Sequence, residues 1–372
     1  MEFLIASLYK YIYIITIGIL TLLYLPKYVY IKTYETGNSL VNKNNAYILL
    51  IAVVLFIGFR PVVEAYFNDM AAYDYTLRRY SEEIFTFDWE TENKIFDNFI
   101  LWYASSGLKR NYFFLVLSTL YFGAMYLGLK RLFPDSTKLA FLTYLAGFST
   151  FTYAVNGMKA GVAASIFILA LSFRDKKLLC ALLMVISLGF HHSMILPIGA
   201  GIVSFFVKNP KIYYCIWGFC LLVCILHITY FQGIFAGMSD DQGAKYLMAT
   251  SETTSAHIGF RPDFILYSAV PVIIGYYFEI RNKYILSRKT QFLIHFYILS
   301  NAVWMLCMYA SFNNRIAYLS WFVYPIVIIA PFLDKMNKDP LRYLKLDKVV
   351  KYHLYFTMFM LLIYYGLFSL GR

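Results

Sequence analysis

Long apolar segments, separated by short clusters of Lys, Arg, Asn and Pro, run through the whole of this 372-residue sequence. A helix rises about 1.5 Å per residue and bilayer hydrocarbon is about 30 Å thick, so about 20 apolar residues cross it. About twelve segments fit this rule, one of them over residues 139–155. Because 60% of the residues are hydrophobic and only 15% are charged, an ordinary soluble domain is excluded. The sequence predicts an all-α fold, a polytopic membrane bundle of about 10–12 transmembrane helices in a single transmembrane domain over 1–372.

Most of the Lys and Arg residues fall in alternate loops between these segments. Short cytoplasmic loops are enriched in Lys and Arg, so this set is predicted to be cytoplasmic, together with loop acids such as Glu279. Both chain ends and two long segments, at about 60–111 and about 232–263, then lie on the outer side. This topology accounts for the net charge of +12, so no nucleic-acid partner is expected.

Isolated polar residues at the outer ends of the apolar segments indicate a binding site. A charge at the end of an apolar helix is costly unless it is paired or faces water. Each of these residues alone is typical of an interfacial anchor, but the set gathered on one face favours a site for an anionic ligand. Its members are Arg60, Lys159, the pair His191 and His192, Arg261 with Asp263, and Asn314 with Arg315.

The two outer segments differ in character. The first contains Asp69 and Tyr73 and then a stretch over 93–105, whose apolar residues recur at helical spacing. That stretch is predicted to be a helix, lying either in the membrane interface or packed over the bundle. The second segment contains Ser239, Asp240 and Asp241 and fits a mobile lid.

Patterns typical of metal and nucleotide sites do not occur. The five cysteines lack CxxC ligand spacing. The adjacent His191 and His192 point in different directions from one turn, so they do not share a metal as the histidines of HExxH do. Walker A, Rossmann and GxSxG patterns are also missing from the sequence. We therefore expect no metal and no cofactor.

Five segments together resemble the EpsG-type, Wzy-like family of bacterial polysaccharide polymerases. They are GFRPVVEAYFNDMAAYDY (58–75), NGMKAGVAASIFILAL (156–171), GFHHSMILP (189–197), GFRPDFILYSAVP (259–271) and NNRIAYLSWFVYP (313–325). They follow the family's order over most of the chain. One difference is Lys159–Ala160, where the family commonly has Arg-Gln; Lys keeps the charge but lacks the planar fork of Arg.

The resemblance implies a fold similar to the GT-C membrane glycosyltransferases. It also implies a polymerase that joins undecaprenyl-diphosphate-linked oligosaccharide repeat units into O-antigen, capsule or exopolysaccharide. Donor and acceptor would both be lipid-linked, and a chain-length regulator is a candidate partner. The site would face the periplasm or cell exterior, from the bacterial inner membrane.

Physical chemistry suggests a role for each candidate under this interpretation. Breaking the anomeric C–O bond leaves a lipid diphosphate. Cationic side chains stabilise its negative charge without a metal. His191 is the candidate base, because an unperturbed imidazole has a pKa of about 6.5, and Asp69 is the alternative base or the group that orients it. The candidate diphosphate ligands are Arg60, Lys159, Arg261 and Arg315. The candidate sugar contacts are Tyr73, His192, Asp263 and Asn314, although Asp263 is as well explained by pairing with Arg261.

Two other functional classes stay open at this stage. A transporter or flippase would also have about twelve helices, but it would favour an acidic residue near the midplane, and none is apparent. An O-antigen ligase would use a similar outer site with a different acceptor.

Overall fold

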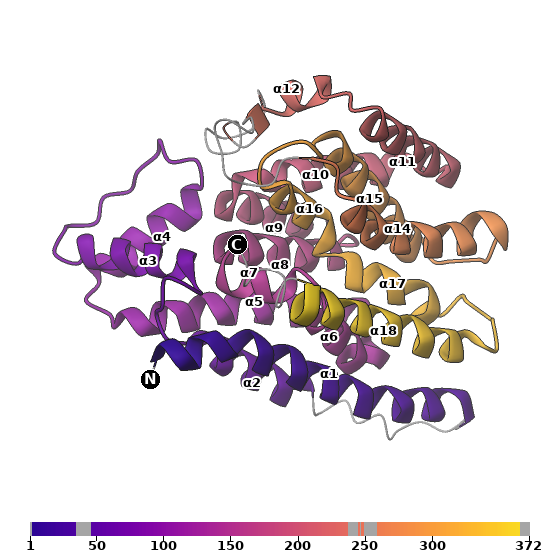
Figure 1. The fold of residues 1–372 in the computed structure, drawn as a ribbon, viewed down its shortest axis with the longest axis horizontal. Helices are drawn as coiled ribbons and strands as arrows, with labels where there is room; N and C mark the ends of the chain where they lie inside the picture. The colour runs from indigo at the N-terminus through magenta and orange to yellow at the C-terminus, as the bar shows by residue number, and fades with distance from the viewer. Residues whose placement is uncertain (1, 35–45, 237–244, 246, 249–258, 365–372) are drawn as a thin grey trace. The chain divides into compact units, whose positions relative to one another are not determined.

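The computed structural model describes residues 2–34, 46–236, 245, 247–248 and 259–364. Throughout these ranges the regular elements are helices and no strand occurs (Figure 1). Two compact units are present: unit 1 comprises Met1–His191 with Tyr343–Arg372, and unit 2 comprises His192–Arg342. The all-α prediction is confirmed, and the single transmembrane domain stays a prediction.

Unit 1 is built around α8, which is buried along almost its whole length between α5 and α9. Small residues such as Ala163, Ala164 and Ser165 allow this close packing. The helices α3 and α4 pack on each other at one end of this unit (Figure 1). The helices of unit 1 are α1 Glu2–Tyr34, α2 Ala46–Gly58, α3 Asn68–Arg79, α4 Lys94–Ser105, α5 Arg110–Leu132, α6 Thr137–Leu145, α7 Thr150–Val155, α8 Met158–Ser172, α9 Lys177–Phe190 and α18 Arg342–Met358, the last followed by the π-helix η5 Phe359–Tyr364.

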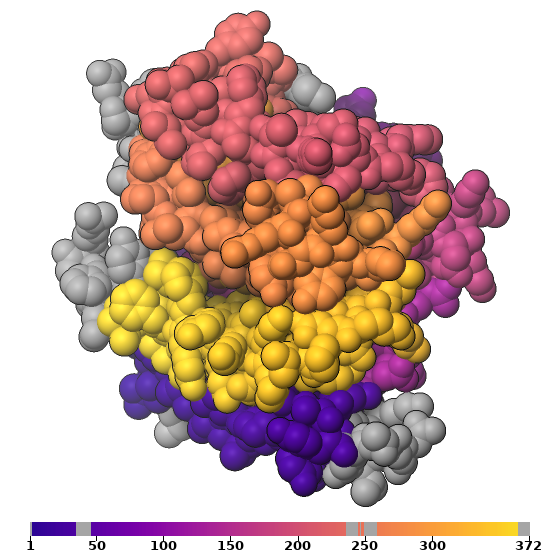
Figure 2. Space-filling view, turned by 90° about the vertical axis from the view of Figure 1, so that its right-hand side faces the viewer, coloured from indigo at the N-terminus to yellow at the C-terminus, as the bar shows by residue number. Residues whose placement is uncertain are grey.

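The C-terminal helix α18 closes unit 1 against the N-terminal helix. Figure 2 shows α18, in yellow, lying along α1, in indigo. The rings of Tyr28 and Tyr343 are 6.3 Å apart, and a Cβ added at Gly18 would lie 3.1 Å from the sulfur of Met358. The first and last helices therefore belong to one core.

Unit 2 is centred on α15, which contacts most of the other helices of this unit. Hydrogen bonds between polar side chains link these helices. The indole of Trp321 donates to the hydroxyl of Ser268 at 2.8 Å, and Trp217 donates to Asn301 at 2.9 Å. The helices are α10 Ile195–Phe206, α11 Pro210–Ile225, α12 Tyr230–Ala236, α14 Pro262–Tyr276 with the π-helix η4 Tyr277–Arg281, α15 Arg288–Leu306, α16 Asn313–Trp321 and α17 Tyr324–Leu333.

Four helical stretches are long and apolar enough to cross a membrane, which confirms the prediction of a polytopic helical membrane protein. They are Glu2–Tyr34, Arg110–Leu132, Pro262–Arg281 and Asn313–Leu333. Five shorter apolar helices accompany them: Ala46–Gly58, Met158–Ser172, Lys177–Phe190, His192–Phe206 and Pro210–Ile225. The total of about 10–12 spans stays a prediction.

One expected span is interrupted. The segment 139–155 was predicted as a single span, but it forms α6 and α7 with a break between Leu145 and Thr150. The hydroxyl of Thr150 donates to the carbonyl of Tyr144 at 2.7 Å, so a side chain satisfies one of the carbonyls left open where α6 ends. Hydropathy alone does not detect such a break, because the residues around it are apolar.

Candidate active site

Phe96 of α4 brings two predicted site residues of unit 1, Tyr73 and Lys159, together with Phe190, the chain neighbour of His191. Its buried ring lies 5.1 Å from the ring of Tyr73 on α3. The Nζ of Lys159, at the start of α8, lies 5.9 Å from the centre of the same ring. Phe190, the residue before His191 at the end of α9, has its ring 6.5 Å away. Parts of four helices therefore meet at this one aromatic side chain.

Close packing of α4 on α9 sets this arrangement. A Cβ added at Gly189 would lie 2.6 Å from the side chain of Ile95, so only glycine permits this approach without a shift. The face of α4 that carries Phe96, Ile100 and Tyr103 is buried. The helix therefore packs on α3 and α9, and its interfacial setting stays a prediction.

Arg60 lies in the loop after α2, and its side chain is only 3% exposed. Its Nη1 donates to the carbonyl of Ile57 at 2.6 Å, and its Nη2 donates to the sulfur of Met158, the first residue of α8, at 2.9 Å. Burial lowers the pKa of Arg60 to about 9, while the charges of Tyr9 and Asp69 act in the opposite direction. Arg60 therefore remains a cation at neutral pH, and its buried Nε has no hydrogen-bond partner.

Asp97 is a functional candidate that sequence reasoning missed. It follows Phe96 on α4, and burial raises its pKa, while the charge of Lys159 and hydrogen bonds from Asn93 act in the opposite direction. Its Oδ2 accepts from the backbone N–H of Asn93 at 3.3 Å. In sequence an acid in the first turn of a helix resembles an ordinary capping residue, so no local signal distinguishes it.

The two predicted catalytic residues also belong to unit 1. Asp69 is half-buried in the first turn of α3, and its charge acts on Arg60. His191 is half-buried and caps α9 in an extended conformation, with its backbone N–H donating to the carbonyl of Ser187 at 3.1 Å. Both side chains are therefore only partly shielded from solvent, as groups that exchange protons with a substrate require.

The remaining predicted residues belong to unit 2. The guanidinium of Arg261 forms a fork on Asp263, with Nε donating to Oδ1 at 3.0 Å and Nη2 to Oδ2 at 2.6 Å. Arg315 is exposed in the first turn of α16, with its guanidinium carbon 5.1 Å from the ring centre of Phe312. Asn314 precedes it and is half-buried, and His192 begins the short helix η3 His192–Met194. The pairing alternative for Asp263 is thus the geometry observed.

A buried carboxylate in unit 2 corrects one sequence interpretation. Glu279 was predicted in a cytoplasmic loop, but its side chain lies buried in η4, near the end of the apolar stretch Pro262–Arg281. Its Oε1 is 3.1 Å from Nε2 of His295, and its Oε2 accepts from the hydroxyl of Tyr214 at 2.8 Å. The hydrogen bond from Tyr214 satisfies one oxygen of this buried carboxylate, and a sequence pattern does not reveal such a non-local partner.

In the part of the chain that the structure describes, no three His, Cys, Asp or Glu side chains gather in a way that would hold a metal ion. The predicted lid residues Ser239, Asp240 and Asp241 lie outside the described residues.

The fold and the polar junction in unit 1 define a polytopic helical membrane protein with a cationic candidate site. The EpsG family matches residues 43–370, nearly the whole chain, and the chain belongs to this family. Membership supports a polysaccharide polymerase-type function in general and lipid-linked oligosaccharides as the class of substrate. No curated protein and no solved structure matches this chain.

Proposed function

We propose that this protein is a membrane glycosyltransferase that polymerises undecaprenyl-diphosphate-linked oligosaccharide repeat units into a surface polysaccharide. The reaction takes place at the outer face of the bacterial inner membrane and needs no metal. The observation that carries the proposal is the junction at Phe96, where Lys159 lies beside an aromatic surface next to Tyr73 and the end of α9. Buried Arg60 adds a second cation at the start of α8.

The proposed step is a single displacement. A sugar hydroxyl of the acceptor attacks the anomeric carbon of the donor, and the bond from that carbon to the diphosphate oxygen breaks. The bonding electron pair leaves with the lipid diphosphate, where the cationic charges of Lys159 and Arg60 stabilise it. His191 takes the hydroxyl proton, with Asp69 as the alternative base or as the group that orients the imidazole.

Aromatic surface supports the sugar-binding part of the proposal. Tyr73 lies on Phe96, and a sugar ring packs its C–H face well on such a side chain. Asp97, the residue after Phe96 and within the field of Lys159, is a further proton-accepting group for this reaction. The diphosphate roles of Arg261 and Arg315 and the sugar roles of His192, Asp263 and Asn314 stay predictions.

The test is the length distribution of surface polysaccharide in a deletion strain complemented at matched membrane levels. Wild type is expected to restore a ladder, whereas Lys159→Ala and His191→Ala are expected to leave a single-repeat band. Lys94→Ala is the matched control, because Lys94 is an exposed cation on α4 whose Nζ donates to the carbonyl of Trp89 at 2.8 Å. A full ladder from His191→Ala contradicts its role as the base.

The same gel separates the proposal from the transporter alternative. A strain that lacks a transporter exposes no outer repeat unit at all, whereas a strain that lacks a polymerase still exposes single units. Absence of the single-repeat band in the variants would therefore favour transport over polymerisation.

A further inference from the structure

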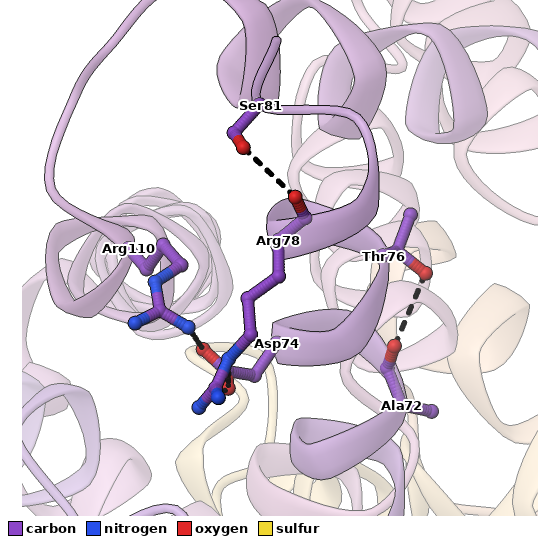
Figure 3. A network of polar contacts seen from close by, with 6 residues as sticks. All are labelled: Ala72, Asp74, Thr76, Arg78, Ser81 and Arg110. Carbon is purple, nitrogen blue, oxygen red and sulfur yellow. Dashed lines mark hydrogen bonds and ion pairs between the residues drawn. The ribbon is translucent and has the colours of Figure 1, made fainter.

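A second polar cluster in unit 1 joins Asp74, Arg78 and Arg110 (Figure 3). The Oδ2 of Asp74 accepts from Nε of Arg78 at 2.8 Å and lies 2.6 Å from its Nη2. The Oδ1 of Asp74 accepts from Nη1 of Arg110, the first residue of α5, at 2.9 Å. Figure 3 shows both guanidinium groups converging on the one carboxylate. Asp74 therefore connects α3 to the start of α5.

The charges in this cluster do not balance. Two cations share one anion, and both carboxylate oxygens are already used. The side chain of Asp74 is only 8% exposed, whereas those of Arg78 and Arg110 are 64% and 42% exposed. Each guanidinium carries five N–H donors. Several donors of each arginine are therefore not used on Asp74 and are directed to solvent. The buried acid thus holds two arginines close together with donors left for a second anion.

Further exposed charges lie near the two arginines in the chain. Arg79 follows Arg78 and Lys109 precedes Arg110, while the acids Glu82 and Glu83 follow the end of α3. Planar guanidinium pairs suit phosphate oxygens, to which they donate in a bidentate manner. An exposed basic surface of this kind favours a phosphate over a single carboxylate.

The apolar residues around Arg110 indicate that the phosphate is carried by a lipid. Leu108 and Tyr112 on either side of Arg110 are exposed, and the exposed ring of Phe59 at the end of α2 lies 6.4 Å from the ring of Tyr112. The helix α5, which Arg110 begins, is one of the four stretches that can cross a membrane. Aromatic residues and Arg at the end of such a helix are typical of the headgroup level.

We propose that Arg78 and Arg110, held by Asp74, bind the diphosphate of the lipid-linked acceptor, an inference that rests on the proposed polymerase function. A reaction between two lipid-linked molecules requires two diphosphate sites. The acceptor reacts through a sugar hydroxyl, so its own diphosphate lies away from the reacting atoms. Asp69 and Arg78 stand in the first and last turns of α3, about 13 Å apart along the helix axis, a distance that a short oligosaccharide covers.

The experiment counts bound lipids on the full chain in nanodiscs of zwitterionic lipid by native mass spectrometry, with undecaprenyl diphosphate as the probe. Wild type is expected to bind two probe molecules. The variant Asp74→Asn/Arg78→Gln/Arg110→Gln, which removes the acid with its partners so that no unpaired buried charge remains, is expected to bind one. Its affinity at the lost site should fall at least tenfold.

The control variant lies at the other end of the same helix. Arg131 of α5 forms an ion pair with Asp175 at 2.7 Å, so Arg131→Gln/Asp175→Asn removes an ion pair from the opposite end of α5. This control is expected to keep two bound probe molecules. Two molecules bound to the triple variant would overturn the inference, as would equal competition by phosphatidylglycerol, which would make the cluster a general anchor for anionic lipids.

His191→Ala separates this inference from the proposed function. It is expected to bind two probe molecules and to make no polymer. Polymer made by His191→Ala while the triple variant binds one probe molecule would remove the proposed base and leave the acceptor site standing. If His191→Ala makes no polymer and the triple variant still binds two probe molecules, the proposed base stands and the acceptor site is overturned.

Discussion

The tetrapeptide Gly-Phe-Arg-Pro occurs twice, at 58–61 in unit 1 and at 259–262 in unit 2, and the two copies have different surroundings. Arg60 is buried and donates to a backbone carbonyl and a thioether. Arg261 instead forms a fork on a carboxylate, that of Asp263. The residue after each proline explains part of this difference, because Val62 offers no charge at the position where Asp263 does.

The glycines of the two copies serve different purposes as well. A Cβ added at Gly58 would lie 2.9 Å from the Cα of Leu115, so this glycine allows α2 and α5 to approach closely. Gly259 has a backbone φ of 151°, which residues other than glycine rarely adopt. Four identical residues thus produce one cation within a packed core and one neutralised at the start of a helix.

Arg60→Ala is expected to have the largest effect in this comparison. It removes a buried side chain with its contacts to α2 and α8 and leaves a cavity, at a cost of about 3 kcal/mol in the free energy of unfolding. Thermal unfolding in detergent micelles measures the loss of stability, and the polysaccharide ladder measures activity. Arg60→Lys keeps the charge and should recover part of both. Unchanged stability in Arg60→Ala would show that the core around the first copy does not depend on this side chain.

Gly189→Ala tests the packing that forms the site of unit 1. The added methyl group would meet the Ile95 side chain at 2.6 Å, so that side chain or α4 itself must shift, at a cost of about 2 kcal/mol. The expected result is a lower melting temperature and a shortened ladder. Gly199→Ala is the matched control, since nothing lies within 4 Å of a Cβ added there. Equal melting temperatures for the two variants would contradict the steric argument.

Asp263→Val makes the second copy resemble the first over five residues. It removes the ion pair with Arg261 and an acid from the first turn of α14, for an expected loss of about 1 kcal/mol. Asp263→Asn keeps the shape and tests the charge alone. Melting temperatures measured at low and high salt check the prediction, because an electrostatic contribution should shrink with salt. A loss that salt leaves unaltered would assign the effect to packing.

Asp97→Asn is expected to have the smallest effect on stability. Unlike the other three variants, it should raise the free energy of unfolding at neutral pH. Burial raises the pKa of Asp97 in the folded protein, so the folded state binds this proton more tightly than the unfolded state does. The carboxyl therefore lowers stability as pH rises above about 4, and at neutral pH the amide should stabilise by less than about 1 kcal/mol. At acidic pH, where the carboxyl is protonated, the gain should vanish. A gain that persists there, in unfolding measured against pH, would exclude the charge as its cause.

Local patterns predicted some of the local structure around the candidate site. The amphipathic spacing over 93–105 indicated the helix observed at Lys94–Ser105, and Lys159 was predicted at the start of an apolar segment, where α8 begins. The helix α3, Asn68–Arg79, was not predicted, because its mean character is polar and its buried residues Met70, Asp74 and Leu77 include an acid. The charge of Lys159 acts on Asp97, and Arg110 pairs with Asp74, only because helices pack together.

The sequence by itself determined the class of this protein, because the length and hydropathy of a helical segment are local properties that one stretch of chain carries alone. Resemblance over five segments also indicated the family, to which the chain belongs. Only the tertiary structure decided which charges are buried, paired or exposed. Arg60 contacts Met158, 98 residues away in the chain, and Glu279 receives a hydrogen bond from Tyr214, 65 residues away. Such partners are brought together by helix packing, which the residues next to each charge do not encode.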